Sequence, residues 1–211
     1  MKIPFFFSLF IIFIVFFNMK LRKVSKEIEN SKKKFLERER ESMFVRKKSL
    51  EDLDYISVSL DDLPMLKEEE LSSDAEKQAY RHQKTALDLA SKPLLNLSGK
   101  SNTDLKFQYG PANLETLMNY EQNYENLLKS LLNWGRYLKK ANRTEDAIAV
   151  LEKAVSIGTD LSQNYILLSD LYHETNQKDK LLNLKELVEN QQGQNTMLKK
   201  VLQHIEHILN M

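Results

Sequence analysis

The pattern of apolar and polar positions divides the chain into an apolar leader, a charged middle and a helical C-terminal half. Residues 3–17 read IPFFFSLFIIFIVFF, with no charged side chain. Extended to Met19, the run makes a helix of about 25 Å, close to the thickness of a bilayer's hydrocarbon core. We therefore expect a transmembrane anchor over residues 1–19, with residues 3–19 in the membrane. A cleaved signal peptide is the alternative, but the run does not end in the small residues that a signal peptidase needs.

A basic stretch follows the leader, and we expect it to form a juxtamembrane helix over residues 20–50. From Lys20 to Lys48 there are twelve Lys and Arg against five Glu, which is a net charge of +7, and no Pro or Gly. The positive-inside rule then places the rest of the chain in the cytosol. The stretch has two further interpretations, a surface for anionic lipid headgroups or a charged spacer. A coiled-coil dimer is a third, although no heptad persists for three repeats in this stretch.

The charge then reverses, and we expect an acidic linker over residues 51–72. Glu51 to Glu76 holds ten Asp and Glu against Lys67 alone. Polar and apolar residues alternate from position 55 to 60, which also fits a short extended strand or a segment that binds its own helical domain. For residues 73–112 we expect a helix, started by a capping box at Ser73 and ended before Pro93, and then an irregular segment over residues 94–109.

From position 113 to 211 the apolar residues recur at helical spacing, and short turns separate the helices. The expected helices are residues 114–140, a helix from Thr144 that stops at Gly158, residues 162–174, residues 178–190 and a last helix from about Thr196. A shift of 34 residues sets one helical pair on the next. It superposes Trp134 on Leu168, Gly135 on Ser169, Leu138 on Tyr172 and Ala154 on Val188.

This period and these residues resemble the tetratricopeptide-repeat (TPR) family. The match covers roughly residues 128–190 and is carried by Trp134-Gly135, Leu138, Ala147, Leu151 and Ala154. Small residues at such positions let paired helices approach closely. The resemblance implies an all-α fold with an α-solenoid of helical hairpins and a capping helix, and no enzyme activity. The strings SNTDLKFQYGPANL and YEQNY are also similar to an uncharacterised group of membrane-anchored TPR proteins of Gram-positive bacteria.

Composition and motif searches give catalysis no support. The chain has no Cys, which excludes disulfides and thiolate chemistry, and its net charge is only +1. No phosphate-binding, dinucleotide, zinc-protease or serine-hydrolase motif is present. His204 and His207 have a spacing that suits a metal, but no third ligand is evident, so surface histidines are the favoured interpretation. We expect no cofactor, metal, small-molecule substrate or nucleic-acid partner.

The resemblance implies instead a groove for an unknown protein or peptide, lined by the first helix of each repeat. Carried onto this chain, the groove residues are Lys129, Leu132, Asn133, Arg136, Lys140, Gln163, Ile166, Leu167, Asp170 and His173. The first half of this set is basic and favours an acidic segment or a C-terminal carboxylate, unless residues 51–112 cover the face. We expect a single-pass, cell-membrane scaffold that faces the cytosol. The alternatives are an exported assembly or chaperone-like factor with the same groove, and an enzyme with an unrecognised site.

Overall fold

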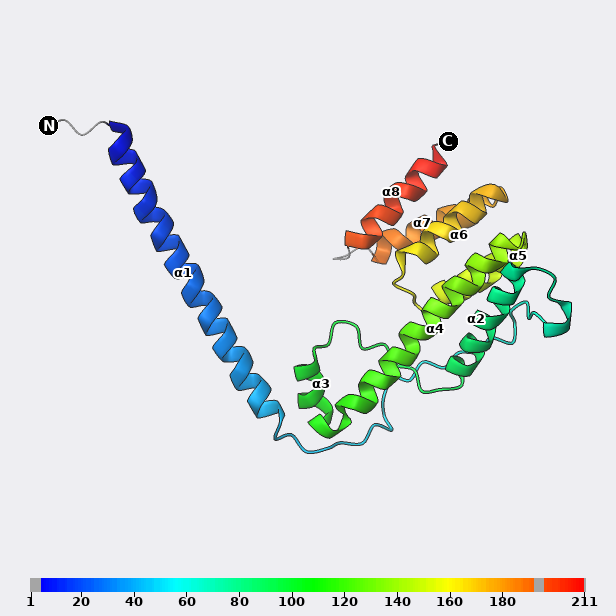
Figure 1. The fold of residues 1–211 in the computed structure, drawn as a ribbon, viewed down its shortest axis with the longest axis horizontal. Coiled ribbons are helices and arrows are strands. Elements are labelled where there is room, and N and C mark those ends of the chain that lie inside the picture. The colour runs from blue at the N-terminus through cyan, green and yellow to red at the C-terminus, as the bar shows by residue number, and fades with distance from the viewer. Residues whose placement is uncertain (1–4, 192–195, 211) are drawn as a thin grey trace. The chain divides into compact units, whose positions relative to one another are not determined.

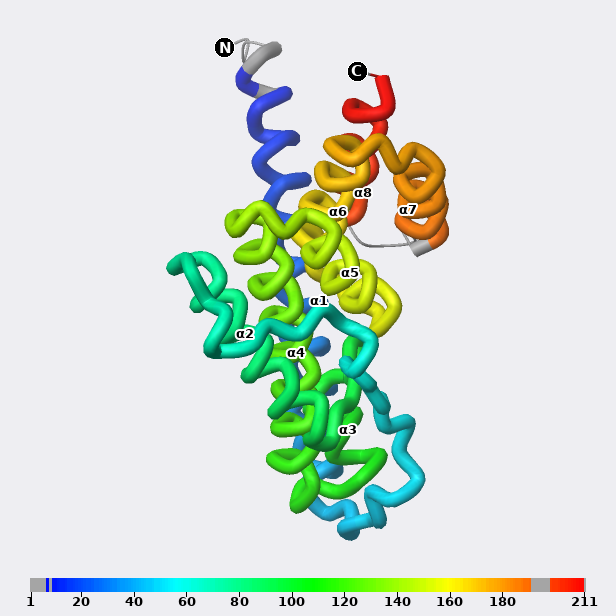
Figure 2. The backbone as a smooth tube through the Cα atoms, turned by 90° about the vertical axis from the view of Figure 1, so that its right-hand side faces the viewer, coloured from blue at the N-terminus to red at the C-terminus, as the bar shows by residue number. Residues whose placement is uncertain are grey.

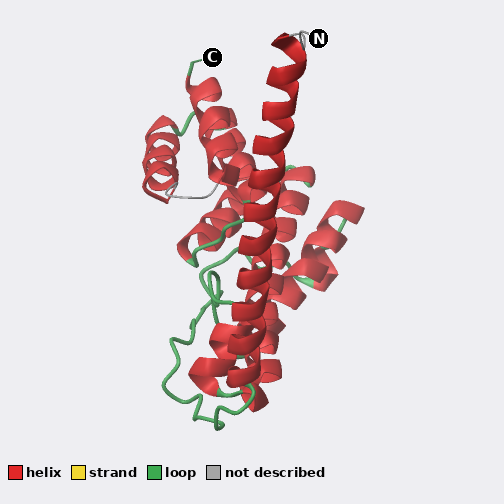
Figure 3. Ribbon diagram, turned by 90° about the vertical axis from the view of Figure 1, so that its left-hand side faces the viewer, coloured by secondary structure: helices red, strands yellow, loops and turns green. Residues whose placement is uncertain are grey.

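The computed structural model describes residues 5–191 and 196–210, and within them the chain is all-α, as the sequence predicts. The described part holds eight α-helices and two 3-10 helices and contains no strand (Figures 1 and 3). The α-helices are α1 (Phe5–Ser42), α2 (Asp74–Ala90), α3 (Asn102–Tyr109), α4 (Leu114–Lys140), α5 (Thr144–Ser156), α6 (Ser162–Glu174), α7 (Lys178–Gln191) and α8 (Thr196–Leu209). The 3-10 helices are η1 (Glu68–Glu70) and η2 (Pro111–Asn113).

The described part of the apolar leader and most of the basic stretch form one helix, α1, which ends at Ser42 rather than at position 50 as expected. From position 7 to 17 its large apolar side chains are exposed, each between 41% and 65%. In the part of the chain whose placement is described, no helix combines the length and the apolar character that crossing a membrane requires. The transmembrane span expected over residues 3–19 is therefore unsupported by the structure, and its first two residues lie outside the described part.

The described chain forms two compact units, and the first comprises residues up to Leu53 together with Ser98–Thr116. In this unit α3 is bonded to the C-terminal turns of α1. Glu39 accepts hydrogen bonds from the Thr103 hydroxyl, at 2.6 Å, and from the Lys106 ammonium group. These bonds hold the pKa of the Glu39 carboxyl below its usual value. The neighbouring residue on α1, Arg38, pairs with Asp104 at 2.5 Å.

The irregular segment expected over residues 94–109 is wrong for its second half, which is α3. A capping box starts the helix: the Ser101 hydroxyl accepts from the Asp104 N–H, and the Asp104 carboxylate accepts from the Ser101 N–H. The Ser-Asn-Thr-Asp string at positions 101–104 suits a turn as well as a helix cap. The same residue types serve both purposes, because their side chains bond nearby backbone groups in caps and in turns.

After α3 the chain makes a close approach to the segment that follows α1. The Tyr109 carbonyl accepts from the Lys48 N–H at 3.1 Å, and the Asn113 amide donates to the Lys48 carbonyl at 2.8 Å. Gly110, with φ +87°, lies so close that a Cβ atom added there would be 2.7 Å from the Arg46 carbonyl oxygen. Glycine is therefore required twice at this position, by its backbone conformation and by the missing side chain.

The second unit, residues 54–97 and 117–210, contains the helical hairpins (Figure 2). The bounds of α4 and α6 match the expected helices, and α7 ends one residue later than expected. Gly135 of α4 faces α5 so closely that a Cβ atom would lie 2.8 Å from Leu151 Cγ. Trp134, Ala147 and Ala154 are fully buried beside this contact. Helix α8 packs on α6 and α7, where it covers the open end of the second hairpin.

Two details of α5 qualify the expected boundaries. Thr144 is the first helical residue, and Arg143 occupies the N-cap position without a side-chain cap bond. At the other end the helix stops before Gly158, whose φ is +91°. The glycine therefore has the left-handed conformation expected of a helix stop.

The acidic segment that follows the first unit lies against the helical core. Leu60, Leu63 and Leu66 are buried. The buried side chain of Gln83, on α2, accepts from the Leu66 N–H at 2.7 Å and donates to the Leu66 carbonyl at 3.1 Å. The backbone N–H and carbonyl of Leu66 thus both have hydrogen-bond partners, although no β-strand of the described chain pairs with this segment.

Replacing Gly110 with Ala should open the contact between α3 and the residues after α1. Gly99→Ala is the matched control, because Gly99 also has a positive φ, of +82°, but nothing lies within 4 Å of an added Cβ. Both variants place a Cβ atom at a positive φ, which side chains rarely adopt, and only Gly110→Ala adds a clash. We expect amide hydrogen exchange in α3 to rise much more in Gly110→Ala. Equal exchange in the two variants would contradict the close approach.

Replacing Gly135 with Ala should destabilise the α4–α5 hairpin, although Ala is the better helix former. Because Leu151 is fully buried and cannot move aside, we expect the free energy of unfolding in urea to fall by about 1–3 kcal/mol. Leu151→Ala alone should cost about 2–5 kcal/mol. The free energy of unfolding should fall less in the double variant than the sum of the two single losses, since Ala at position 151 removes the clash. Additive losses would mean that the two side chains do not meet.

Candidate functional site

Arg136 lies where α4 meets α6, and amide groups hold its side chain. One guanidinium nitrogen donates to Asn133 Oδ1 at 2.9 Å, and the other donates to Gln163 Oε1 at 2.6 Å. The residue is half-buried. Among the residues that the structure describes, no carboxylate forms an ion pair with it. The two amide oxygens orient the guanidinium group without neutralising its charge.

Helix α2 adds an aromatic contact to this site. The His82 ring stacks on Tyr137, with ring centroids 5.6 Å apart and an interplanar angle of 12°. The Lys140 ammonium nitrogen lies 5.0 Å from the centroid of the same Tyr137 ring. Burial lowers the pKa of His82, and the positive charge of Arg136 lowers it further. We call this surface, formed by His82, Asn133, Arg136, Tyr137, Lys140 and Gln163, the Arg136 face.

Four of the ten groove residues expected from the sequence thus belong to the Arg136 face: Asn133, Arg136, Lys140 and Gln163. The structure places the other six differently. Leu132 is buried, and Ile166 and Leu167 are half-buried against the core. Lys129 pairs with Glu125 of its own helix at 2.9 Å. Only four of the ten expected side chains therefore lie together on this polar face.

The last two expected groove residues face the C-terminal end of the chain. Asp170 lies 2.7 Å from His204 of α8, so its carboxylate already has a partner. His173 is exposed and lines a hollow of about 350 Å³ with residues of α7 and α8. The His204–His207 pair considered for metal binding is thus divided, because His204 contacts α6. No group of three metal-ligating side chains occurs within the described ranges.

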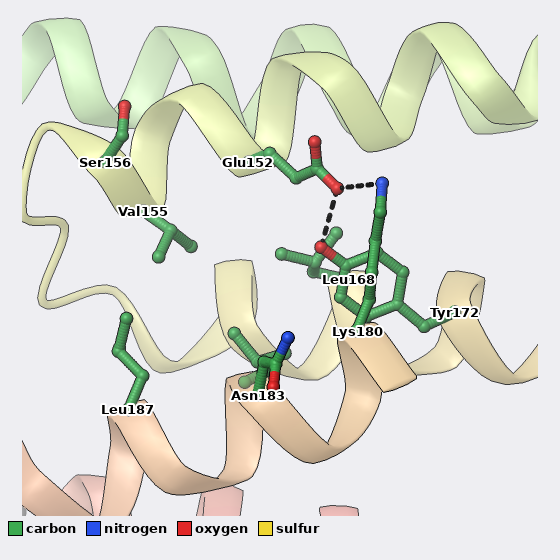
Figure 4. Close-up of a pocket in the computed structure, with 9 residues that line it drawn as sticks. Glu152, Val155, Ser156, Leu168, Tyr172, Lys180, Asn183 and Leu187 are labelled. Carbon is green, nitrogen blue, oxygen red and sulfur yellow. Dashed lines mark hydrogen bonds and ion pairs between the residues drawn. The ribbon is translucent and has the colours of Figure 1, made fainter. Parts of the chain in front are cut away.

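A second surface hollow, which the sequence analysis missed, lies between α5, α6 and α7 (Figure 4). Its volume is about 470 Å³, and apolar side chains of Val155, Leu168, Leu184 and Leu187 line much of it. At one end Glu152 Oε1 accepts from the Tyr172 hydroxyl at 2.7 Å and from the Lys180 ammonium group at 2.8 Å (Figure 4). These residues are far apart in sequence and belong to three helices, so no local pattern could have revealed them.

Three polar groups of this hollow, those of Glu152, Tyr172 and Lys180, satisfy one another. Burial raises the pKa of the Tyr172 hydroxyl, and the neighbouring Glu152 carboxylate raises it further. The phenol therefore stays protonated at neutral pH and donates to a carboxylate that Lys180 also neutralises. These three side chains are thus paired with one another, whereas no carboxylate of the described chain pairs with Arg136. The Arg136 face is therefore the stronger candidate for binding.

No protein-family model, no curated protein and no solved structure matches this chain. The function must therefore be argued from the geometry and charge of the site itself.

Proposed function

We propose that this chain is a membrane-attached protein-interaction scaffold of the TPR type, whose Arg136 face binds an acidic segment of a partner protein. One observation carries the proposal: a half-buried guanidinium group is held by two amide oxygens and by no carboxylate of the described chain. Arginine matches the planar, two-oxygen geometry of a carboxylate, and such charge-assisted bonds are about twice as strong as neutral ones.

The surroundings of Arg136 support an anionic partner rather than a neutral one. Lys140 is exposed and lies over the Tyr137 ring, so it adds a second cation close to Arg136. The neighbouring Lys139, by contrast, is already paired with Glu174 at 2.7 Å. The Arg136 face thus concentrates unneutralised positive charge on an otherwise balanced domain, which favours negative ligands.

Two contacts join residues that are separated by the repeat length, which supports the TPR assignment. The Tyr124 hydroxyl donates to the Gly158 carbonyl at 3.0 Å, and the two residues are 34 positions apart. The Asp170–His204 contact has the same separation of 34. Two hairpins followed by α8 also fit a short solenoid with a terminal cap, because unpaired apolar faces at the ends of an array need covering.

The exposed apolar side chains of α1 support attachment to a membrane. Large apolar residues that remain exposed at 41–65% from position 7 to 17 would be unfavourable in water. Lys20, Arg22 and Lys23 follow directly, where basic residues interact with anionic headgroups. In this proposal residues 3–19 enter the bilayer and the Arg136 face is cytosolic. Alkaline phosphatase activity from a reporter fused after Met211 would contradict that orientation.

Replacing Arg136 with Gln should weaken the binding of an acidic peptide. With full-length protein in detergent and a fluorescein-labelled deca-glutamate probe, we expect the Kd from anisotropy to rise about tenfold or more, since bonds to charged groups contribute about 1.5–3 kcal/mol. Lys129→Gln is the control, because it removes the same charge from the same helix at an exposed residue that already pairs with Glu125. It should change the Kd less than about twofold. Equal effects would indicate unspecific charge attraction.

Lysine substitutions in the apolar leader test membrane attachment. The full chain should stay in the membrane pellet after an alkaline carbonate wash, because apolar side chains in the bilayer resist extraction. Ile11→Lys combined with Ile14→Lys should release most of the protein into the supernatant. Leu36→Lys is the control, since Leu36 is also exposed on α1 but lies beyond the leader. A wild-type protein that the wash extracts would overturn this part of the proposal.

A further inference from the structure

The basic part of α1 carries a narrow apolar stripe that no residue of the described chain covers. Leu21, Val24, Ile28 and Phe35 are exposed at 48%, 50%, 63% and 57%. Around them residues 20–36 are charged or polar, apart from Leu36. An apolar stripe on a charged helix needs a partner, since its exposure to water is unfavourable.

The spacing of the stripe identifies the kind of partner. Because α1 is one uninterrupted helix from Phe5 to Ser42, its positions keep a constant register. With Leu21 as heptad position a, Ile28 and Phe35 are also a positions, and Val24 and Ser31 are d positions. The leader is apolar on every side, so it has no separate apolar stripe. We call the a and d positions from Leu21 to Phe35 the seam. Four of these five positions are apolar, which is the pattern of a coiled coil.

From the sequence the coiled coil is only one of three interpretations of this stretch, because Ser31 interrupts the second heptad and Arg38 occupies the next d position. The structure explains Arg38. Its guanidinium group pairs with Asp104 at 2.5 Å and lies 5.6 Å from the centre of the Phe107 ring. It therefore belongs to the contact with α3, and the seam ends at Phe35.

The charged residues beside the seam favour a parallel pair formed with a second copy of this chain. In a parallel pair, position g of one helix faces position e of the next heptad in its partner. Glu27 is at g and Lys32 is at e, so each chain offers one charge of each sign at matching heights. Neither side chain forms an ion pair within the described part of its own chain. The next such pair, Lys34 with Glu39, is weakened because Glu39 already bonds Thr103 and Lys106.

We propose that α1 pairs with α1 of a second copy as a parallel coiled coil from Leu21 to Phe35, with Glu27 of each chain opposite Lys32 of the other. The dimer presents two Arg136 faces. A partner with two acidic segments then gains avidity, because the second contact becomes intramolecular. The coiled coil does not depend on what the Arg136 face binds, so either proposal can fail alone.

Cysteine cross-linking tests the dimer directly, because the chain has no Cys of its own. Val24→Cys places a thiol in the seam at position d, and Lys26→Cys places one at position f, on the opposite side of the helix. With full-length protein in detergent micelles, copper–phenanthroline oxidation should convert most of the Val24→Cys protein into a disulfide dimer on non-reducing gels. Lys26→Cys should give several-fold less. Similar dimer fractions at both positions, or a Val24→Cys protein that stays monomeric, would overturn the proposal.

A charge swap tests the register and the direction. In the Val24→Cys background, Glu27→Lys should reduce the cross-linked fraction, because Lys then faces Lys across the seam. Adding Lys32→Glu should restore it, since opposite charges meet again. Reduction without restoration would show that these two residues do not face each other, and the parallel pairing as proposed would be wrong.

Discussion

The close approach of α4 and α5 at Gly135 is the contact on which the second unit depends. Any side chain at this position would collide with Leu151, which is fully buried and has no room to move. The contact also sets the direction of the next residue. Because successive helical residues are turned by about 100°, a glycine that faces α5 leaves Arg136 pointing away from that interface. There it meets Gln163 of α6.

The binding proposed for the Arg136 face depends on which charged side chains remain unpaired. Most ionic side chains of the helical domain have a nearby partner, and three polar groups of the second hollow satisfy one another around Glu152. Arg136 differs because its two bonds go to amide oxygens, which orient the group and leave its charge intact. A surface of this kind is organised before a ligand arrives, so less ordering cost opposes binding.

The first unit has a different physical character. Its helix α1 is held at one end by bonds from α3 to Arg38 and Glu39, and elsewhere it exposes an apolar leader and a narrow apolar stripe that water does not favour. A bilayer is proposed to cover the leader, and a second copy of α1 is proposed to cover the stripe beyond it. Both proposals follow from one constraint, that exposed apolar surface needs a partner.

The sequence by itself determined the all-α class, the bounds of α4 and α6, the capped start of α2 at Ser73 and the helix stop at Gly158. These features depend on contacts within a few residues, which periodicity and capping rules describe. Only the tertiary structure decided that His82 stacks on Tyr137, that Asp170 is paired with His204 and that Leu60 is buried. Such contacts join residues far apart in the chain. This packing decides which of the expected groove residues remain unpaired. The partners of a side chain lie on helices that no local sequence pattern places beside it.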